Sequence, residues 1–82
     1  MKLIKVDQVD KEPWEDKLFT GPVTLQAIIG KELSENFLIQ QVNFSKGARN
    51  KFHSHSTEQI LIVTEGKGIV ATDKEEITVR PG

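Results

Sequence analysis

The chain has 82 residues, with 11 lysines and arginines against 12 aspartates and glutamates, and it has no cysteine. A formal net charge of −1 gives no general attraction to nucleic acid or anionic lipid, and no run approaches the ~18 apolar residues of a membrane helix. Because disulfides and thiolate metal sites are excluded as well, we expect one small cytoplasmic domain that binds neither nucleic acid nor membranes, with only nitrogen and oxygen donors for a metal.

The first part of the chain is the least regular. Residues 3–6 form a short candidate strand, and residues 7–17 are polar, with Pro13 opposing regular pairing. The lone Trp14 is interpreted as an anchor that pins this N-terminal arm, residues 1–17, onto the rest of the protein. A role in binding aromatic ligands is the alternative.

Two longer strands are expected next. Residues 23–29 are rich in β-forming side chains, a loop is expected over residues 30–36, and residues 37–44 form the following strand. Alternation along this second strand places four side chains on one face: Leu38, Gln40, Val42 and Phe44.

The C-terminal third predicts further strands. Residues 59–64 are apolar on both parities, which predicts a strand covered on both faces. A tight turn at residues 65–68 is expected to join this strand to residues 69–72, which form a second hairpin with residues 77–79. No helix with apolar periodicity is found, so the pattern predicts an all-β sandwich or barrel.

The most informative motif spans residues 47–66 and reads Gly-x5-His-x-His-x3-Gln-x6-Gly. On an extended strand His53, His55 and Gln59 share a parity and can converge on one point. Imidazole nitrogen and amide oxygen are donors for divalent metals, so these three side chains are possible metal ligands. Glu58 is the rival ligand, but it needs a bulge to reach the same face. Two surface histidines on an edge strand are the plain alternative.

The spacing resembles the first signature motif of the cupin superfamily, where Glu is usual in place of Gln59. It is closer still to a branch of small bacterial manganese cupins that includes hydroxynitrile lyases and cupins associated with carboxymuconolactone decarboxylase, in which Gln is common. The resemblance runs from about residue 18 to the end and also includes Phe19-Thr20-Gly21, Val23, Gly47-Ala48-Arg49, Leu61, Val63 and Thr64. It implies a cupin-type double-stranded β-helix, or jelly roll, over residues 18–82.

The resemblance also implies a site. The metal ligands would be His53, His55 and Gln59, with manganese expected first and iron, zinc, nickel, cobalt and copper as alternatives. An uncharged amide ligand holds the ion less tightly than a carboxylate and leaves it a stronger Lewis acid. The implied lining of a small-molecule pocket is Gln40, Val42 and Phe44, for which plain core lining is the alternative.

The family's second motif would begin at Pro81-Gly82, where the sequence stops, so half to two-thirds of a barrel is expected. A chain this short buries only about 60–65% of the surface that its unfolded form exposes, and open strand edges invite pairing with another chain. We therefore expect a homodimer that completes the barrel. A longer form of the protein is the alternative.

Function follows less directly, because one fold hosts many reactions. The resemblance implies a metal-dependent small-molecule enzyme, with a lyase as the first expectation and its catalytic residues unassigned. Neither a nucleophile elbow nor a phosphate-binding loop is present in the sequence. The alternatives are a non-catalytic metal- or ligand-binding module and a half-barrel assembly unit.

Overall fold

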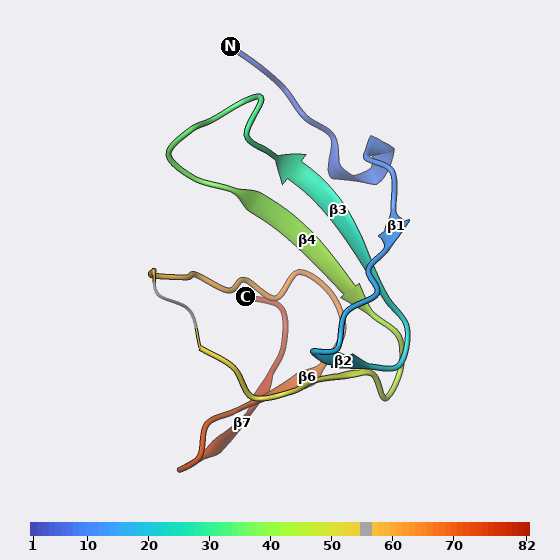
Figure 1. The fold of residues 1–82 in the computed structure, drawn as a ribbon, viewed down its shortest axis with the longest axis vertical. Coiled ribbons are helices and arrows are strands. Elements are labelled where there is room, and N and C mark those ends of the chain that lie inside the picture. Colours follow the sequence, from blue (N-terminus) through green and yellow to red (C-terminus); the bar gives the residue numbers. More distant parts are fainter. Residues whose placement is uncertain (55–56) are drawn as a thin grey trace. The chain divides into compact units, whose positions relative to one another are not determined.

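The computed structural model describes residues 1–54 and 57–82, and all the regular elements in these ranges are strands apart from one 3-10 turn (Figure 1). The all-β class expected from the sequence is confirmed. The elements in chain order are η1 (Val6–Gln8), β1 (Glu12–Pro13), β2 (Phe19–Thr20), β3 (Val23–Ile29), β4 (Ile39–Phe44), β5 (Arg49–Asn50), β6 (Gly68–Ala71) and β7 (Glu76–Val79). The chain divides into two compact units, Met1–Lys51 and Phe52–Gly82. Among the described residues, no helix is long and apolar enough to cross a membrane.

The main sheet of the first unit has the strand order β1-β3-β4, with antiparallel pairs throughout. β3 has the bounds expected from its β-branched composition, whereas β4 begins at Ile39, two residues later than expected. The delay has a local cause, because the backbone N–H groups of Asn36 and Phe37 donate to Ser34 Oγ, at 3.2 and 3.4 Å, instead of joining a ladder. The loop between the strands is confirmed.

The expected strand at residues 3–6 is wrong. The chain there lies outside any strand, and η1 begins at Val6. The side chain of Gln26 holds this turn against β3: its Nε2 donates to the carbonyl oxygens of Val6, at 2.8 Å, and Val9, at 2.9 Å. Carbonyls satisfied by a side chain in this way do not need a strand partner.

Gln26 is the most deeply buried polar residue described, at 1% exposure. Its Oε1 accepts hydrogen bonds from Gln41 Nε2 and Asn43 Nδ2, both at 3.1 Å. The amide therefore uses its donors and its acceptor together, as a buried polar group must to avoid a desolvation penalty. These bonds connect the N-terminal arm to β3 and β4.

Three aromatic side chains pack together at the face of β3 opposite to Gln26. Trp14 and Phe19 make an edge contact with their centroids 4.9 Å apart, and Phe19 makes a second one with Phe44 at 5.9 Å. The backbone N–H of Trp14 donates to the carbonyl oxygen of Val23 at 2.9 Å, and Val23 is only 4% exposed. These contacts favour the anchoring role of Trp14. Pro13, which lacks an N–H, lies on the edge strand β1, where its missing donor costs no ladder bond.

The second unit contains the β6–β7 hairpin, which the sequence predicted. The pair is antiparallel, and Ile69 lies opposite Thr78. Thr72 closes the turn: its N–H donates to Glu75 O at 2.8 Å, and its Oγ1 accepts from the backbone N–H groups of Lys74 and Glu75, both at 3.2 Å. Local turn chemistry therefore determines this hairpin.

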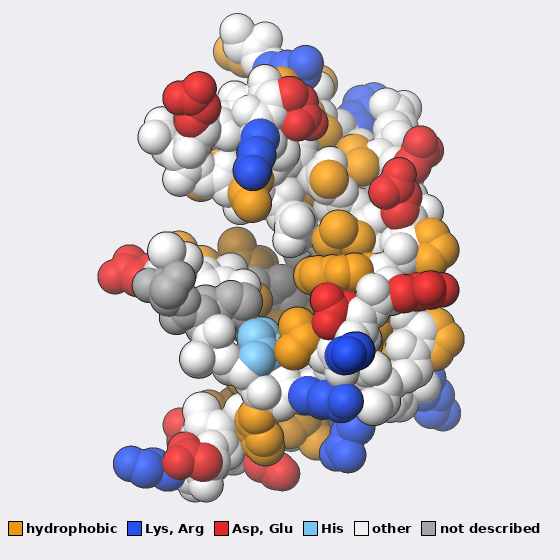
Figure 2. Space-filling model, viewed as in Figure 1, with side chains coloured by type: hydrophobic (Ala, Val, Ile, Leu, Met, Phe, Trp, Pro, Cys, Tyr) orange, Lys and Arg blue, Asp and Glu red, His pale blue; other side chains and the backbone are white. Residues whose placement is uncertain are grey.

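The expected strand over residues 59–64 is wrong, and so is its hairpin with residues 69–72. Residues 59–64 lie outside any strand. The partner expected for them, β6, pairs with β7 instead, and no other described strand pairs with β6. Its side chains are not covered on both faces, since Ile60, Leu61 and Ile62 are 87, 70 and 78% exposed. Figure 2 shows apolar side chains at the surface among the charged ones.

Candidate metal site

The backbone that enters the histidine motif is held by a short strand pair. β5 pairs with β2 in antiparallel register, with Arg49 opposite Thr20 and Asn50 opposite Phe19. The ladder continues one step further, because the Lys51 N–H donates to Leu18 O at 2.6 Å. These hydrogen bonds hold residues 49–51, which precede His53 in the sequence.

Gly21, which follows β2, lies close to the turn that precedes β5. A Cβ at Gly21 would lie 3.0 Å from both the Cα and the Cβ of Ala48, and the φ angle of Gly21 is +89°. Both the space and the backbone conformation therefore require glycine here. The Ala48 N–H in turn donates to Ser45 O at 2.9 Å, which closes the turn through Gly47.

Beyond Asn50 the structure differs from the expected extended strand. The described residues from Lys51 to Ser54 and from Thr57 to Gln59 are not in a strand. β2 has only two residues, so among the described strands none pairs with the chain beyond the Lys51 bond to Leu18. His53 and Gln59 are exposed, and Phe52 beside His53 is 78% exposed. His55, the third predicted ligand, lies outside the described residues.

The donor set itself fits a divalent transition ion. Two imidazoles and an amide oxygen are neutral donors of intermediate and hard character, suited to manganese, iron, cobalt, nickel, copper and zinc. In the ranges 1–54 and 57–82, no group of three or more His, Cys, Asp and Glu side chains is close enough to hold a metal. Glutamine is not among these residue types and His55 lies outside the ranges, so the ligand set of His53, His55 and Gln59, with Glu58 as the rival, stays a prediction.

Comparison with known families decides the family. A family profile for the cupin domain matches residues 40–82, which is more than half of the chain. This chain belongs to the cupin family. The matched range contains β4 except its first residue, the whole histidine motif and the β6–β7 hairpin. Searches of curated proteins and of solved structures found no match.

The predicted pocket lining of this cupin lies on β4, in the first unit. The register places Gln40 opposite Ala27, Val42 opposite Leu25 and Phe44 opposite Val23, so the three residues share one face of the sheet, as predicted. Val42 is half-buried, Gln40 is exposed, and Phe44 is 47% exposed. The structure brings these three residues together, and their contact with a ligand stays a prediction.

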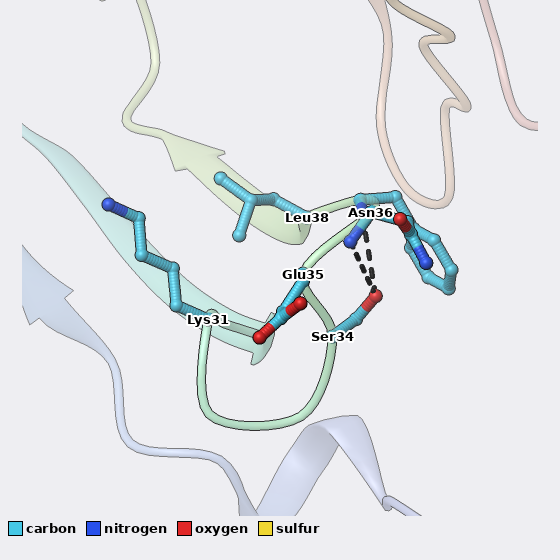
Figure 3. A pocket seen from close by; sticks show the side chains of 6 residues that line it. Lys31, Ser34, Glu35, Asn36 and Leu38 are labelled. Carbon is cyan, nitrogen blue, oxygen red and sulfur yellow. Dashed lines mark hydrogen bonds between the residues drawn. The ribbon is translucent and has the colours of Figure 1, made fainter.

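Two shallow pockets of this cupin occur elsewhere in the first unit. One, of about 180 Å³, lies at the β3–β4 loop and is lined by Lys31, Ser34, Glu35, Asn36, Phe37 and Leu38 (Figure 3). The other, of about 230 Å³, is lined by Val9, Asp10, Glu12, Leu25 and Ala27. Both are smaller than the roughly 300–1,000 Å³ usual for small-molecule sites. Neither pocket includes a residue of the predicted metal site.

One feature near the motif was missed by sequence reasoning. Phe19-Thr20-Gly21 and Gly47-Ala48-Arg49 were each recognised as family-like segments, but their meeting was not predicted. The available signal was that each segment ends or begins at a glycine beside strand-forming residues, which is compatible with two strands that approach closely. The pairing of the segments is a long-range contact that neither segment shows by itself.

Proposed function

We propose that this cupin is a metal-binding protein that holds one divalent transition ion through His53, His55 and Gln59, with manganese first. The observation that supports the proposal is the donor set, which lies wholly inside the range matched by the cupin profile.

The finer proposal is a metal-dependent lyase of the small manganese cupin type. When bound, a divalent ion supplies Lewis acidity toward a substrate hydroxyl or carbonyl oxygen. The neutral amide of Gln59 preserves more of the ion's charge than a carboxylate would. For the small-molecule ligand we propose contact with the β4 face of Gln40, Val42 and Phe44.

A non-catalytic metal- or ligand-binding module is the second candidate, and one observation favours it. The described part of the motif is exposed, at Phe52, His53 and Gln59, whereas catalytic sites are enclosed enough to exclude water. Turnover separates the two: a metal-loaded sample that cleaves no member of a panel of hydroxynitriles and other 2-hydroxy compounds supports the module. A sample that takes up no metal supports the assembly unit.

Native mass spectrometry with manganese, before and after chelation, tests the proposed function. We expect one ion per chain and its loss to the chelator, because two imidazoles and an amide oxygen bind reversibly. A protein that stays metal-free in manganese, iron and zinc alike contradicts the proposal.

The same spectra report the number of subunits. We propose that this cupin forms a homodimer. Ile60 and Ile62 are exposed and have no strand neighbour among the described residues, and exposing such apolar side chains to water is costly. We expect a dimer at micromolar concentration. A monomer that persists at high protein concentration and unfolds cooperatively contradicts it.

Exchanging Gln59 for glutamate is expected to tighten manganese binding by about tenfold or more, which corresponds to about 1.4 kcal/mol. The carboxylate adds a negative charge at the ion that the amide lacks. Isothermal titration of Gln59→Glu beside the wild type measures the change. As a control, Glu58→Gln is expected to leave the affinity nearly unchanged. A larger effect at residue 58 than at residue 59 would show that Glu58 is the ligand.

A further inference from the structure

We infer that two copies of this chain pair edge to edge through β4, in antiparallel register, about a two-fold axis that passes through Val42. The inference rests on the proposed homodimer and names its interface. It uses only the first unit, Met1–Lys51, where β4 is the outer strand of the order β1-β3-β4. Among the described strands only β3 pairs with β4, so the other edge of β4, called here the open edge, has no strand partner.

Two hydrogen bonds establish which backbone groups of β4 face β3. The Ser45 N–H donates to Pro22 O at 3.0 Å, so the backbone of Ser45 faces β3. On the other side of the sheet the Trp14 N–H donates to Val23 O at 2.9 Å, so the backbone of Val23 faces away from its β4 partner, Phe44. Because the groups of successive strand residues point to opposite sides, both bonds assign Phe44 to the open edge.

The same alternation assigns the remaining groups of the open edge. They are the backbone N–H and C=O of Gln40, Val42 and Phe44, whereas those of Gln41 and Asn43 face β3. These three N–H donors and three C=O acceptors have no hydrogen-bond partner among the residues that the structure describes. A row of such groups is a template for a further strand.

The open edge also has none of the residues that usually prevent strand pairing. Natural edges commonly carry lysine, other charges or proline, but residues 39–45 contain none of these. The opposite edge of the same sheet is protected, because β1 consists only of Glu12 and Pro13. Apolar side chains lie beside the open edge, since Leu38 and Phe44 are 57 and 47% exposed. Pairing is therefore expected at β4 and not at β1.

A second copy fits this edge because two-fold symmetry satisfies every open group. An axis through Val42 places Val42 opposite the partner's Val42 and Gln40 opposite the partner's Phe44. The three N–H donors of each copy then make six hydrogen bonds, which use all the acceptors as well. An axis through Gln41 would instead place Phe44 opposite the partner's Leu38, outside the strand. Since the axis brings the same uncharged segment of both copies together, no like charges meet.

Hydrogen exchange of single amides in metal-free wild-type protein tests the pairing. The exchange is followed by NMR over a dilution series that spans dissociation, and sedimentation of the same samples gives the dimer fraction. We expect the amides of Gln40, Val42 and Phe44 to become at least about tenfold more protected as the dimer forms. Those of Gln41 and Asn43 are the internal control, because they face β3 and their protection should not follow the concentration.

A single introduced cysteine tests the register. The chain has no cysteine, so any disulfide joins two copies. Val42→Cys is expected to cross-link under mild oxidation, because paired Cα atoms lie about 5.5 Å apart, within the disulfide range of about 4.4–6.8 Å. Leu25→Cys is the matched control: Leu25 lies opposite Val42 on β3, and both are half-buried. Across the axis its two copies are three strand spacings apart, about 14 Å, so we expect at least about tenfold slower cross-linking.

The outcomes separate this interface from the other proposals. Protection of the edge amides that is independent of concentration shows that the chain's own residues cover β4, and it overturns the inference. Edge amides that stay unprotected in the dimer, or equal cross-linking of Val42→Cys and Leu25→Cys, also overturn it, while the homodimer stands on another surface. A monomer at every concentration overturns the homodimer together with its interface. Metal uptake by that monomer then decides the metal-binding proposal separately.

Discussion

Replacing His53 and His55 together by alanine is expected to abolish the uptake of divalent metal. The two imidazoles are the only histidine donors in the sequence, and there is no thiolate to replace them. An amide oxygen alone is too weak a donor to retain a transition ion. Bound manganese and zinc, measured by elemental analysis after gel filtration, should fall from about one per chain to background.

Glu58→Ala is the matched control for the histidine changes. It removes a neighbouring oxygen donor from the same exposed segment, and we expect nearly unchanged metal uptake. Circular dichroism of each variant checks that the fold is retained. Uptake that survives the double histidine change would show that the motif is not the metal site. Uptake lost in Glu58→Ala would instead assign the third ligand to Glu58.

Replacing Gln26 by leucine is expected to lower the free energy of unfolding by about 1–3 kcal/mol or more. The carbonyl oxygens of Val6 and Val9 lose the side-chain donor of Gln26, and the amides of Gln41 and Asn43 lose its Oε1 as an acceptor, although Gln41 keeps its bond to Asn43 Oδ1. These groups lie against a side chain that is 1% exposed, so water replaces the lost bonds poorly. The effect is large beside the usual total of about 5–15 kcal/mol for a folded domain.

Urea denaturation measures this change, and Gln40→Leu is its control. The substitution is chemically identical, but Gln40 on β4 is exposed, so we expect a change within about 0.5 kcal/mol. Increased protease cleavage near Val9 in Gln26→Leu would locate the damage in the N-terminal arm. Equal stability of Gln26→Leu and the wild type would show that the amide does not hold the arm.

Local signals explain the elements that were predicted correctly. β3 follows from a run of β-forming residues, and the β6–β7 hairpin follows from a turn in which Thr72 satisfies its neighbours. The shared face of Gln40, Val42 and Phe44 needs only the alternation of a strand. The candidate ligands came from the spacing of the motif together with its resemblance to cupins, and the cupin profile matched the same segment.

The two errors in the C-terminal half of the chain share one cause. Residues 59–64 have strand-like composition, and the motif before them has strand-like spacing, yet a strand forms only where another strand supplies N–H and C=O partners. β5 ends after Asn50 because β2 is equally short. Composition describes what a segment can do, whereas the partner that permits it lies elsewhere in the fold.

By itself, the amino-acid sequence determined the all-β class, the two long strands, the C-terminal hairpin and the identity of the candidate metal donors, because each depends on neighbours a few positions apart. Only the tertiary structure decided that Gln26 is buried beneath the N-terminal arm and that Gly21 meets Ala48. Those contacts join segments about 17 to 27 positions apart, and a long-range contact forms through packing that no local pattern encodes.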